Sequence, residues 1–107
     1  MRELDLAWAA GLFDGEGHTG ARLTKYGTIQ IQMQMHQKGL EVLTRLQEVL
    51  GGKIYQVKTR DNIHFWTVGK LASVESIIND LWPYLSEPKQ LQILKALTLK
   101  YGEPYGS

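Results

Sequence analysis

Two carboxylates stand two residues apart in a glycine-rich stretch near the start of the chain, Asp14-Gly15-Glu16-Gly17. Before them, residues 3–13 repeat apolar side chains at three- and four-residue spacing, which predicts a helix that ends at this stretch. Carboxylates beside an open backbone can hold Mg²⁺, which takes carboxylate, carbonyl and water oxygens. On these residues alone, a turn aspartate and a surface glutamate are the commoner explanation, so the pair is a candidate metal site that needs support from the rest of the chain.

The charged side chains are distributed unevenly along the 107 residues, although the net charge is only +1. Residues 1–17 hold one basic and four acidic side chains, a net −3, whereas residues 18–66 hold seven basic and three acidic side chains, a net +4. A basic segment favours a polyanionic partner, and an acidic one favours a cation. The charge distribution therefore predicts a polyanionic partner near the middle of the chain and a cation near its acidic start.

The segment 28–37 alternates apolar and polar side chains along its length. Strict alternation is typical of a strand with one face toward the core. Together with segment 18–25 it flanks Tyr26-Gly27, so the two segments predict a β-hairpin. Its apolar face holds Ile29, Ile31, Met33 and Met35, and its other face holds Gln30, Gln32, Gln34 and His36.

The remaining elements follow from apolar periodicity and turn signals. They are an amphipathic helix closed by Gly51-Gly52, a second hairpin around Asp61-Asn62 and two more helices, at residues 39–50, 53–60 with 63–68, 71–81 and 89–101. This order predicts one α+β domain over residues 1–107, in which 102–107 form a short tail. The facing of strand 63–68 stays open, because Trp66 falls in phase with His64.

The amide-rich and basic strands are candidates for reading DNA. In a major groove, which admits a two-stranded ribbon, Gln can bond adenine and Arg can bond guanine, while Lys binds phosphates. A polar face that meets only water fits the pattern equally well, although such a face gains nothing by excluding acids. We expect DNA contacts from Arg22, Thr24, Lys25, Gln30, Gln32, Gln34, His36, Gln56, Lys58, Arg60 and His64.

Composition excludes several classes of function. The chain has no cysteine, so it has no Cys-ligated zinc, thiol nucleophile or disulfide. No apolar run approaches the roughly 18 residues that span a bilayer, and the acids in Met1-Arg2-Glu3-Leu4-Asp5 are atypical of a signal peptide. We therefore expect an intracellular protein with no membrane partner and no small-molecule substrate.

The stretch Ala9-Ala10-Gly11-Leu12-Phe13-Asp14-Gly15-Glu16-Gly17 resembles the motif of the LAGLIDADG homing endonucleases. Ala9 stands in place of the opening Leu of that motif, and Glu16 in place of its last Asp. The similarity extends to the order of elements, to Leu50-Gly51-Gly52-Lys53-Ile54-Tyr55 and to Trp82-Pro83-Tyr84-Leu85. The resemblance implies an αββαββαα domain with a four-stranded antiparallel DNA-binding sheet backed by helices.

The resemblance also implies a C2 homodimer that makes a double-strand cut in a long, pseudo-palindromic DNA site. In such a dimer, two copies of the motif helix pack along their small residues. For the helix taken alone, an ordinary contact of small residues inside one domain is the preferred explanation. The residues expected at the dimer interface are Ala7, Ala10, Gly11 and Asp14.

In the family, the last acid of the motif binds the catalytic divalent metal, which assigns Mg²⁺ or Mn²⁺ to Glu16, with the Gly17 carbonyl as a further ligand. Asp14 matches the first acid, which is mainly structural. Gln37 matches a residue that positions the attacking water, and Lys89 resembles a base near the scissile phosphate. Each of these two also has an ordinary explanation, as a strand-end cap and as an exposed residue at a helix start.

Two other functions remain as alternatives. An intron RNA maturase or a non-cleaving DNA- or RNA-binding protein of the same family would share the fold, although retention of Glu16, Gln37 and Lys89 favours cleavage. A small β-sheet RNA-binding module is disfavoured, because such modules stack bases on exposed aromatic rings. We expect the outward strands of this chain to offer glutamine instead.

Overall fold

The computed structural model describes residues 2–59 and 62–102. Its elements follow the order predicted from the sequence. They are α1 (Arg2–Glu16), β1 (Gly17–Leu23), β2 (Ile29–Lys38), α2 (Glu41–Leu50), β3 (Lys53–Gln56), β4 (Ile63–Val68), α3 (Leu71–Leu81), the 3₁₀ turn η1 (Trp82–Tyr84) and α4 (Glu87–Tyr101). The strands form one antiparallel sheet in the order β1-β2-β4-β3, which confirms the predicted α+β architecture.

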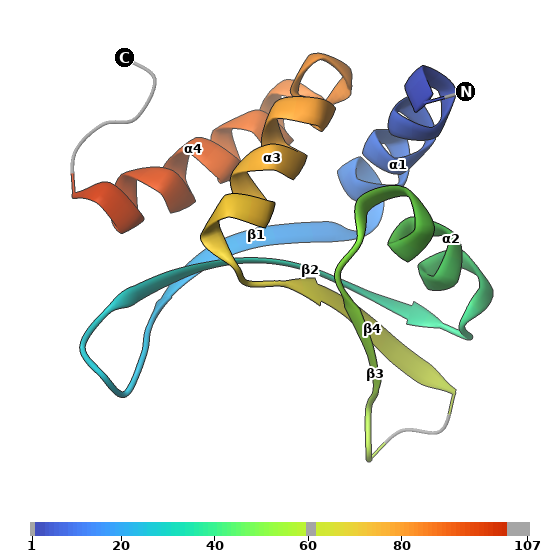
Figure 1. The fold of residues 1–107 in the computed structure, drawn as a ribbon, viewed down its shortest axis with the longest axis horizontal. Helices are drawn as coiled ribbons and strands as arrows, with labels where there is room; N and C mark the ends of the chain where they lie inside the picture. The colour runs from blue at the N-terminus through green and yellow to red at the C-terminus, as the bar shows by residue number, and fades with distance from the viewer. Residues whose placement is uncertain (1, 60–61, 103–107) are drawn as a thin grey trace.

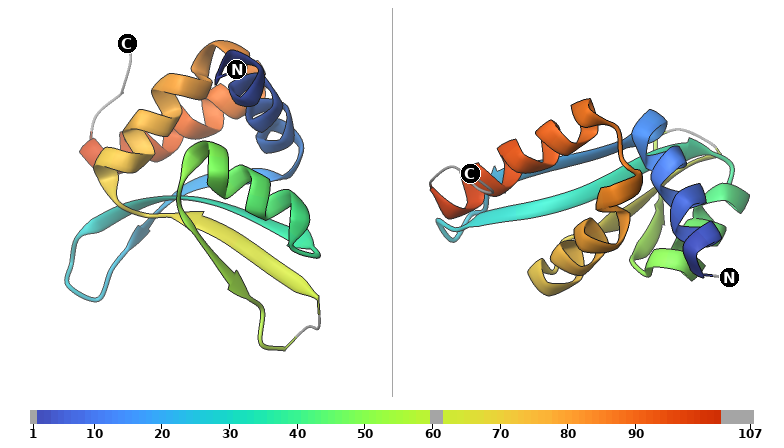
Figure 2. Two further views of the ribbon diagram at one scale, coloured as in Figure 1. Left: turned by 45° about the vertical axis from the view of Figure 1, so that its right-hand side comes forward. Right: turned by 90° about the horizontal axis from the view of Figure 1, so that it is seen from above.

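The four helices lie on one side of the sheet and leave its other side open (Figures 1 and 2). Both hairpins bend away from the helices, so the open face is concave (Figure 1). Helix α1 stands steeply on the sheet and joins β1 at its C-terminal end, while α4 runs alongside β1. None of the described helices is long and apolar enough to cross a membrane.

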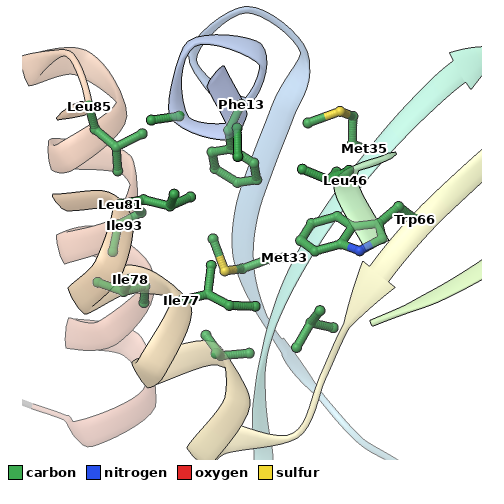
Figure 3. Close-up of a cluster of buried hydrophobic side chains, with 14 of the residues drawn as sticks. Phe13, Met33, Met35, Leu46, Trp66, Ile77, Ile78, Leu81, Leu85 and Ile93 are labelled. Atoms are coloured by element: carbon green, nitrogen blue, oxygen red, sulfur yellow. The ribbon is translucent and has the colours of Figure 1, made fainter. Parts of the chain in front are cut away.

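The hydrophobic core fills the space between the helices and the sheet. Strand β2 contributes Ile31, Met33 and Met35, all buried, which confirms the apolar face predicted from its alternation. The helices pack buried side chains against them from above, including Phe13, Leu46, Leu81 and Ile93 (Figure 3).

Strand β4, whose facing the sequence left open, directs Trp66 and Val68 into this core. In the register of the sheet, Trp66 pairs with Met35 and Val68 pairs with Met33, so all four share one face. The indole Nε1 of Trp66 donates a hydrogen bond to the Gly51 carbonyl at 2.7 Å, which satisfies its polar atom inside the core. Gly51, at φ 77°, ends α2 as predicted.

Helix α1 ends later than the sequence predicts. It continues through Asp14-Gly15-Glu16, and β1 begins at Gly17 with no loop between them. Neither Gly15 nor Gly17 has a positive φ, so these glycines do not break the helix by a left-handed turn. Instead, Gly17 allows close approach: a β-carbon there would overlap the ring of Phe13, which is fully buried.

Strand β3 is shorter than the predicted strand 53–60, because it ends at Gln56. The backbone N–H of Val57 still bonds the Ile63 carbonyl at 2.8 Å, and the chain then turns at Lys58 and Thr59. The predicted helices 39–50 and 89–101 begin at Glu41 and Glu87 instead.

Replacing Gly17 by Ala should lower the free energy of unfolding by about 1–3 kcal/mol, the usual cost of an overpacked core, because the new methyl group overlaps Phe13. Gly20→Ala on the same strand is the matched control, since a β-carbon there meets only the end of the His18 side chain. Urea denaturation of both variants measures the difference. Equal stability of the two would contradict the proposed packing.

Candidate functional site

The junction of α1 and β1 places an exposed carboxylate at the end of a helix. Glu16 is the last residue of α1 and is exposed, whereas Gly17 begins β1 and is buried. The C-terminal end of a helix carries a partial negative charge, which disfavours acids and favours cations. The last turn of α1 contains Asp14 and Glu16 and no base, so a cation near Glu16 would relieve unfavourable electrostatics.

Lys89 reaches this junction from the first turn of α4. Its half-buried side chain donates from Nζ to the Gly17 carbonyl at 2.6 Å and lies 3.5 Å from Oε1 of Gln92. The same Gln92 oxygen accepts the backbone N–H of Thr19 at 3.1 Å. The start of β1 is therefore held by two side chains of α4, and Lys89 lies next to the residue that follows Glu16. In the single chain, the Gly17 carbonyl already accepts the hydrogen bond from Lys89. Of the two expected metal ligands, Glu16 is therefore the one left without this competing contact.

Gln37 lies at the same end of the sheet. Gly17 pairs with Met35 in β2, and Gln37 is two residues further along, which is about 7 Å along a strand. Gln37 is half-buried and, by the alternation of the strand, shares the helix-covered face with Met35. The topology thus brings Glu16, Gln37 and Lys89, the three predicted catalytic residues, to one region.

Asp14 bonds to its own chain. Its carboxylate accepts the backbone N–H of Ser86 at 3.0 Å and 3.2 Å and the Ser86 hydroxyl at 3.1 Å. Because Ser86 precedes α4, this contact fixes the helix that carries Lys89 to the end of the helix that carries Glu16. This geometry agrees with a mainly structural role for the first acid of the motif.

The small residues of α1 separate into two groups. Ala7 and Gly11 are exposed, and together with Leu4 and Gly15 they form an exposed stripe along the helix, the α1 stripe. Ala10, which we expected at the dimer interface, has 0% exposure and belongs to the core of its own chain. The sequence interpretation was wrong for Ala10 because it treated every small residue of the helix as one surface, whereas Ala10 shares the buried side with Leu6, Ala9 and Phe13.

The open face of the sheet carries a large part of the predicted DNA-binding set. None of the four strands contains Asp or Glu. The side chains of Arg22 and Gln30 bond each other at 3.0–3.1 Å, and Gln32 donates to Thr67 at 2.8 Å. The members of the predicted set that alternate onto this face are Arg22, Gln30, Gln32, Gln34 and His36.

Of the other six predicted DNA contacts, the five that the structure describes lie elsewhere. The register pairs Gln56 with His64 in phase with Ile54 and Trp66, so both belong to the helix side of the sheet. The physical reason is the burial of Trp66, which fixes the phase of β4 and, through pairing, that of β3. The others are Thr24 and Lys25 in the turn after β1, Lys58 in the turn after β3, and Arg60, which lies outside the described residues.

The same phase brings residues that sequence reasoning missed onto the open face. Lys38 and Lys53 add positive charge there, and Tyr55 and Phe65 add aromatic rings. Our expectation that the outward strands lack aromatic residues was therefore wrong. The signal was present in the sequence, since Phe65 adjoins Trp66, but it could be used only once the facing of Trp66 was known.

Within residues 2–59 and 62–102, no group of three His, Asp or Glu side chains is placed to hold a metal ion. One chain offers the exposed carboxylate of Glu16 at the helix end. Mg²⁺ is commonly bound by one or two protein carboxylates, with water and substrate phosphate completing the shell. The Glu16 carboxylate is compatible with a metal site completed by water and substrate phosphate, rather than with a site enclosed by one chain.

Comparison with known families gives a direct assignment. The model of the family described as LAGLIDADG endonuclease matches residues 9–98, which is most of the chain. The chain belongs to the LAGLIDADG endonuclease family. Among curated proteins, no sequence matches it significantly.

Solved structures of homing endonucleases share the fold. The homing endonuclease I-CvuI, solved in complex with its target in the presence of calcium, superposes with a TM-score of 0.78 at 22% identity, covering 92% of this chain and 68% of that one. I-CeuI complexed with DNA gives 0.73 at 19% identity, covering 92% and 54%. The archaeal intron-encoded I-Vdi141I complexed with DNA gives 0.72 at 19% identity, covering 95% and 72%.

Replacing Asp14 by Ala should lower the free energy of unfolding by about 0.5–1.5 kcal/mol, because the exposed Ser86 backbone N–H then exchanges its carboxylate acceptor for water. Ser86→Ala removes only the hydroxyl contact and should cost less. Chemical denaturation of both single variants and the double variant gives the coupling energy. Strictly additive effects would show that the hydroxyl contact does not contribute to holding α4 against α1.

Proposed function

We propose that this chain is a site-specific homing endonuclease that cuts both strands of a long, pseudo-palindromic DNA site as a metal-dependent homodimer. The single observation that carries the proposal is the position of Glu16. This exposed carboxylate ends the helix that bears the exposed α1 stripe, and it adjoins the Lys89 contact at Gly17.

The α1 stripe supports a dimer. Leu4 is 65% exposed, and a β-carbon built at Gly11 or Gly15 meets nothing within 4 Å in its own chain. Glycine in a helix costs roughly 0.5–1 kcal/mol relative to alanine, so two glycines on one exposed stripe need a reason. Close approach of a second copy of α1 supplies it, since small residues let two helix backbones meet. A two-fold axis through this contact would bring the two Glu16 residues together.

The open face of the sheet supports duplex DNA as the substrate. It is concave, and its strands contain no acidic residue. Along β1 and β2 it presents amide and basic side chains at regular spacing. Phosphate contacts from Lys and Arg position a protein on DNA, and amide or guanidinium groups read base edges. Two such faces in a symmetric dimer fit a site with two related halves.

The chemistry at the junction divides among this chain's own groups. Glu16 supplies the anionic oxygens that would hold Mg²⁺ or Mn²⁺. Such an ion, when bound, activates water and stabilises charge on the phosphoryl oxygens and the leaving oxygen. Lys89 places a positive charge where negative charge develops on the phosphate, and Gln37 offers an amide that can orient water.

A maturase or a binding protein of the same family is the alternative. The RNA-binding module that reads bases by stacking is less well supported, although Tyr55 and Phe65 lie on the open face. The ring of Phe65 stacks against the rings of both His36 and Tyr55, so Phe65 has no free face for a base. The position of Glu16 beside Lys89 favours cleavage over binding alone.

The direct test incubates the purified protein with a randomised duplex library and Mg²⁺ and sequences the cleaved products. We expect recovery of a pseudo-palindromic sequence. Glu16→Gln should leave duplex binding nearly unchanged and lower the cleavage rate on the order of 10²- to 10³-fold, because a neutral amide does not replace the anionic ligand. Glu48→Gln, which removes the same charge from an exposed position on α2, should cut like the parent. Parental cutting by Glu16→Gln would overturn the assignment of the metal.

Gly11→Leu should convert the protein from dimer to monomer, because the new side chain projects from the α1 stripe into the second copy. The fold of each chain should persist, since leucine is the better helix former by about 0.8 kcal/mol and the position is open. Ala72→Leu places the same side chain at an exposed position of α3 and should stay dimeric. Light scattering after gel filtration gives the mass. A monomeric parent, or a dimeric Gly11→Leu variant, would contradict the proposed interface.

A further inference from the structure

Three aromatic side chains form a row across the open face of the sheet. His36 on β2 pairs in register with Phe65 on β4, which pairs in turn with Tyr55 on β3. The ring centroids of His36 and Phe65 are 5.4 Å apart with 25° between the planes, and those of Tyr55 and Phe65 are 5.3 Å apart with 30°. We call these three residues the aromatic row.

The stacking decides which part of each ring a ligand can meet. Strand β4 lies between β2 and β3, so Phe65 has a neighbouring ring against each of its faces. A nucleic-acid base therefore cannot stack on Phe65. What Phe65 offers to the open face is its edge, made only of C–H groups. Tyr55, 46% exposed, and the exposed His36 flank this edge.

The surroundings of the row favour a polyanion. Lys38 follows His36 by two residues on the same face of β2, and Lys53 precedes Tyr55 by two residues on β3. A hollow of about 660 Å³ adjoins the row, with Lys53, Tyr55, Gln32 and Thr67 among its lining residues. Phe65 does not itself line this hollow, which reaches the row at Tyr55. An apolar edge beside lysines and a hollow with amide side chains fits an occupant that has a charged backbone and one apolar feature.

The major groove of DNA has such a feature. The base-pair edges there carry hydrogen-bond donors and acceptors, and their apolar group is the C5 methyl of thymine. Phe65 has no donor or acceptor, so it cannot distinguish bases by hydrogen bonds. Resting on the function proposed above, we propose that the aromatic row reads thymine methyl groups in each half of the DNA site.

The register also locates the reading position. His36 directly follows Met35, which pairs with Gly17, so the row lies at the end of the sheet nearest Glu16. Arg22 and Gln30 pair five residues further along β2 from Met35. The thymine read by the aromatic row is therefore nearer the cleavage centre than the bases read by Arg22 and Gln30.

The test replaces thymine by deoxyuridine, which removes only the methyl group, at each position of the duplex recovered from the library. Binding of the parent protein should weaken about fourfold per half-site at one or two positions near the centre, as expected for the loss of one buried methyl contact. Placing 5-methylcytosine against guanine at that position should bind better than cytosine. This scan needs no variant, so it does not depend on whether an altered protein folds.

Substitution of Phe65 then assigns the effect to the row. Phe65→Ala should bind the thymine and deoxyuridine duplexes equally, whereas Phe65→Leu, which keeps an apolar side chain, should retain part of the preference. A library that yields no bound or cleaved duplex would overturn the proposed function itself. A recovered duplex that is insensitive to the methyl group at every position near its centre, or a methyl effect that persists unchanged in Phe65→Ala, would overturn only the reading by the aromatic row.

Discussion

The packing of the Phe13 ring against the bare backbone of Gly17 is the constraint on which the rest of this structure depends. It allows α1 to pass into β1 without a loop, so that a helix and a strand meet at a fixed angle. Lys89 and Gln92 then hold the first residues of β1 from the side of α4, and Asp14 holds the start of α4 through Ser86. One corner of the domain thus joins the α1 stripe, the sheet and the exposed carboxylate of Glu16.

This arrangement gives each surface of the chain one main task. The helices cover one side of the sheet and bury the apolar residues that stabilise the fold. The open face of the sheet is not covered by helices and carries amide side chains, basic side chains and the aromatic row. The α1 stripe is separate from both. Membership of the LAGLIDADG endonuclease family agrees with this division. The proposed dimer contact would account for the exposed glycines on a helix whose other side is buried.

Local patterns in the sequence predicted the element order and the apolar face of β2, because periodicity depends only on neighbouring residues. They could not assign the phase of β3 and β4. That phase is set by Trp66, which is buried in the core while its indole N–H bonds the Gly51 carbonyl, 15 residues away in the sequence. The same limit explains why Gln56 and His64 were placed on the wrong side and why Phe65 and Tyr55 were missed.

The predicted site shows a similar division. Glu16, Gln37 and Lys89 were named from resemblance to a family motif, and the topology brings them to one end of the sheet. Ala10 was misplaced because spacing along a helix does not say which of two small-residue sides faces the core. The contact from Lys89 to the Gly17 carbonyl joins residues far apart in the sequence, so no local pattern could have revealed it.

The pleat of β2 has an evolutionary consequence. Its even-numbered side chains face outward and its odd-numbered side chains from Ile31 to Met35 are buried, so the two sets can change independently. Under the proposed function, exchange of one outward amide for another polar group would alter specificity and leave the interior untouched. A lineage with this strand could thus drift to new recognition sequences by single substitutions, without passing through unfolded intermediates.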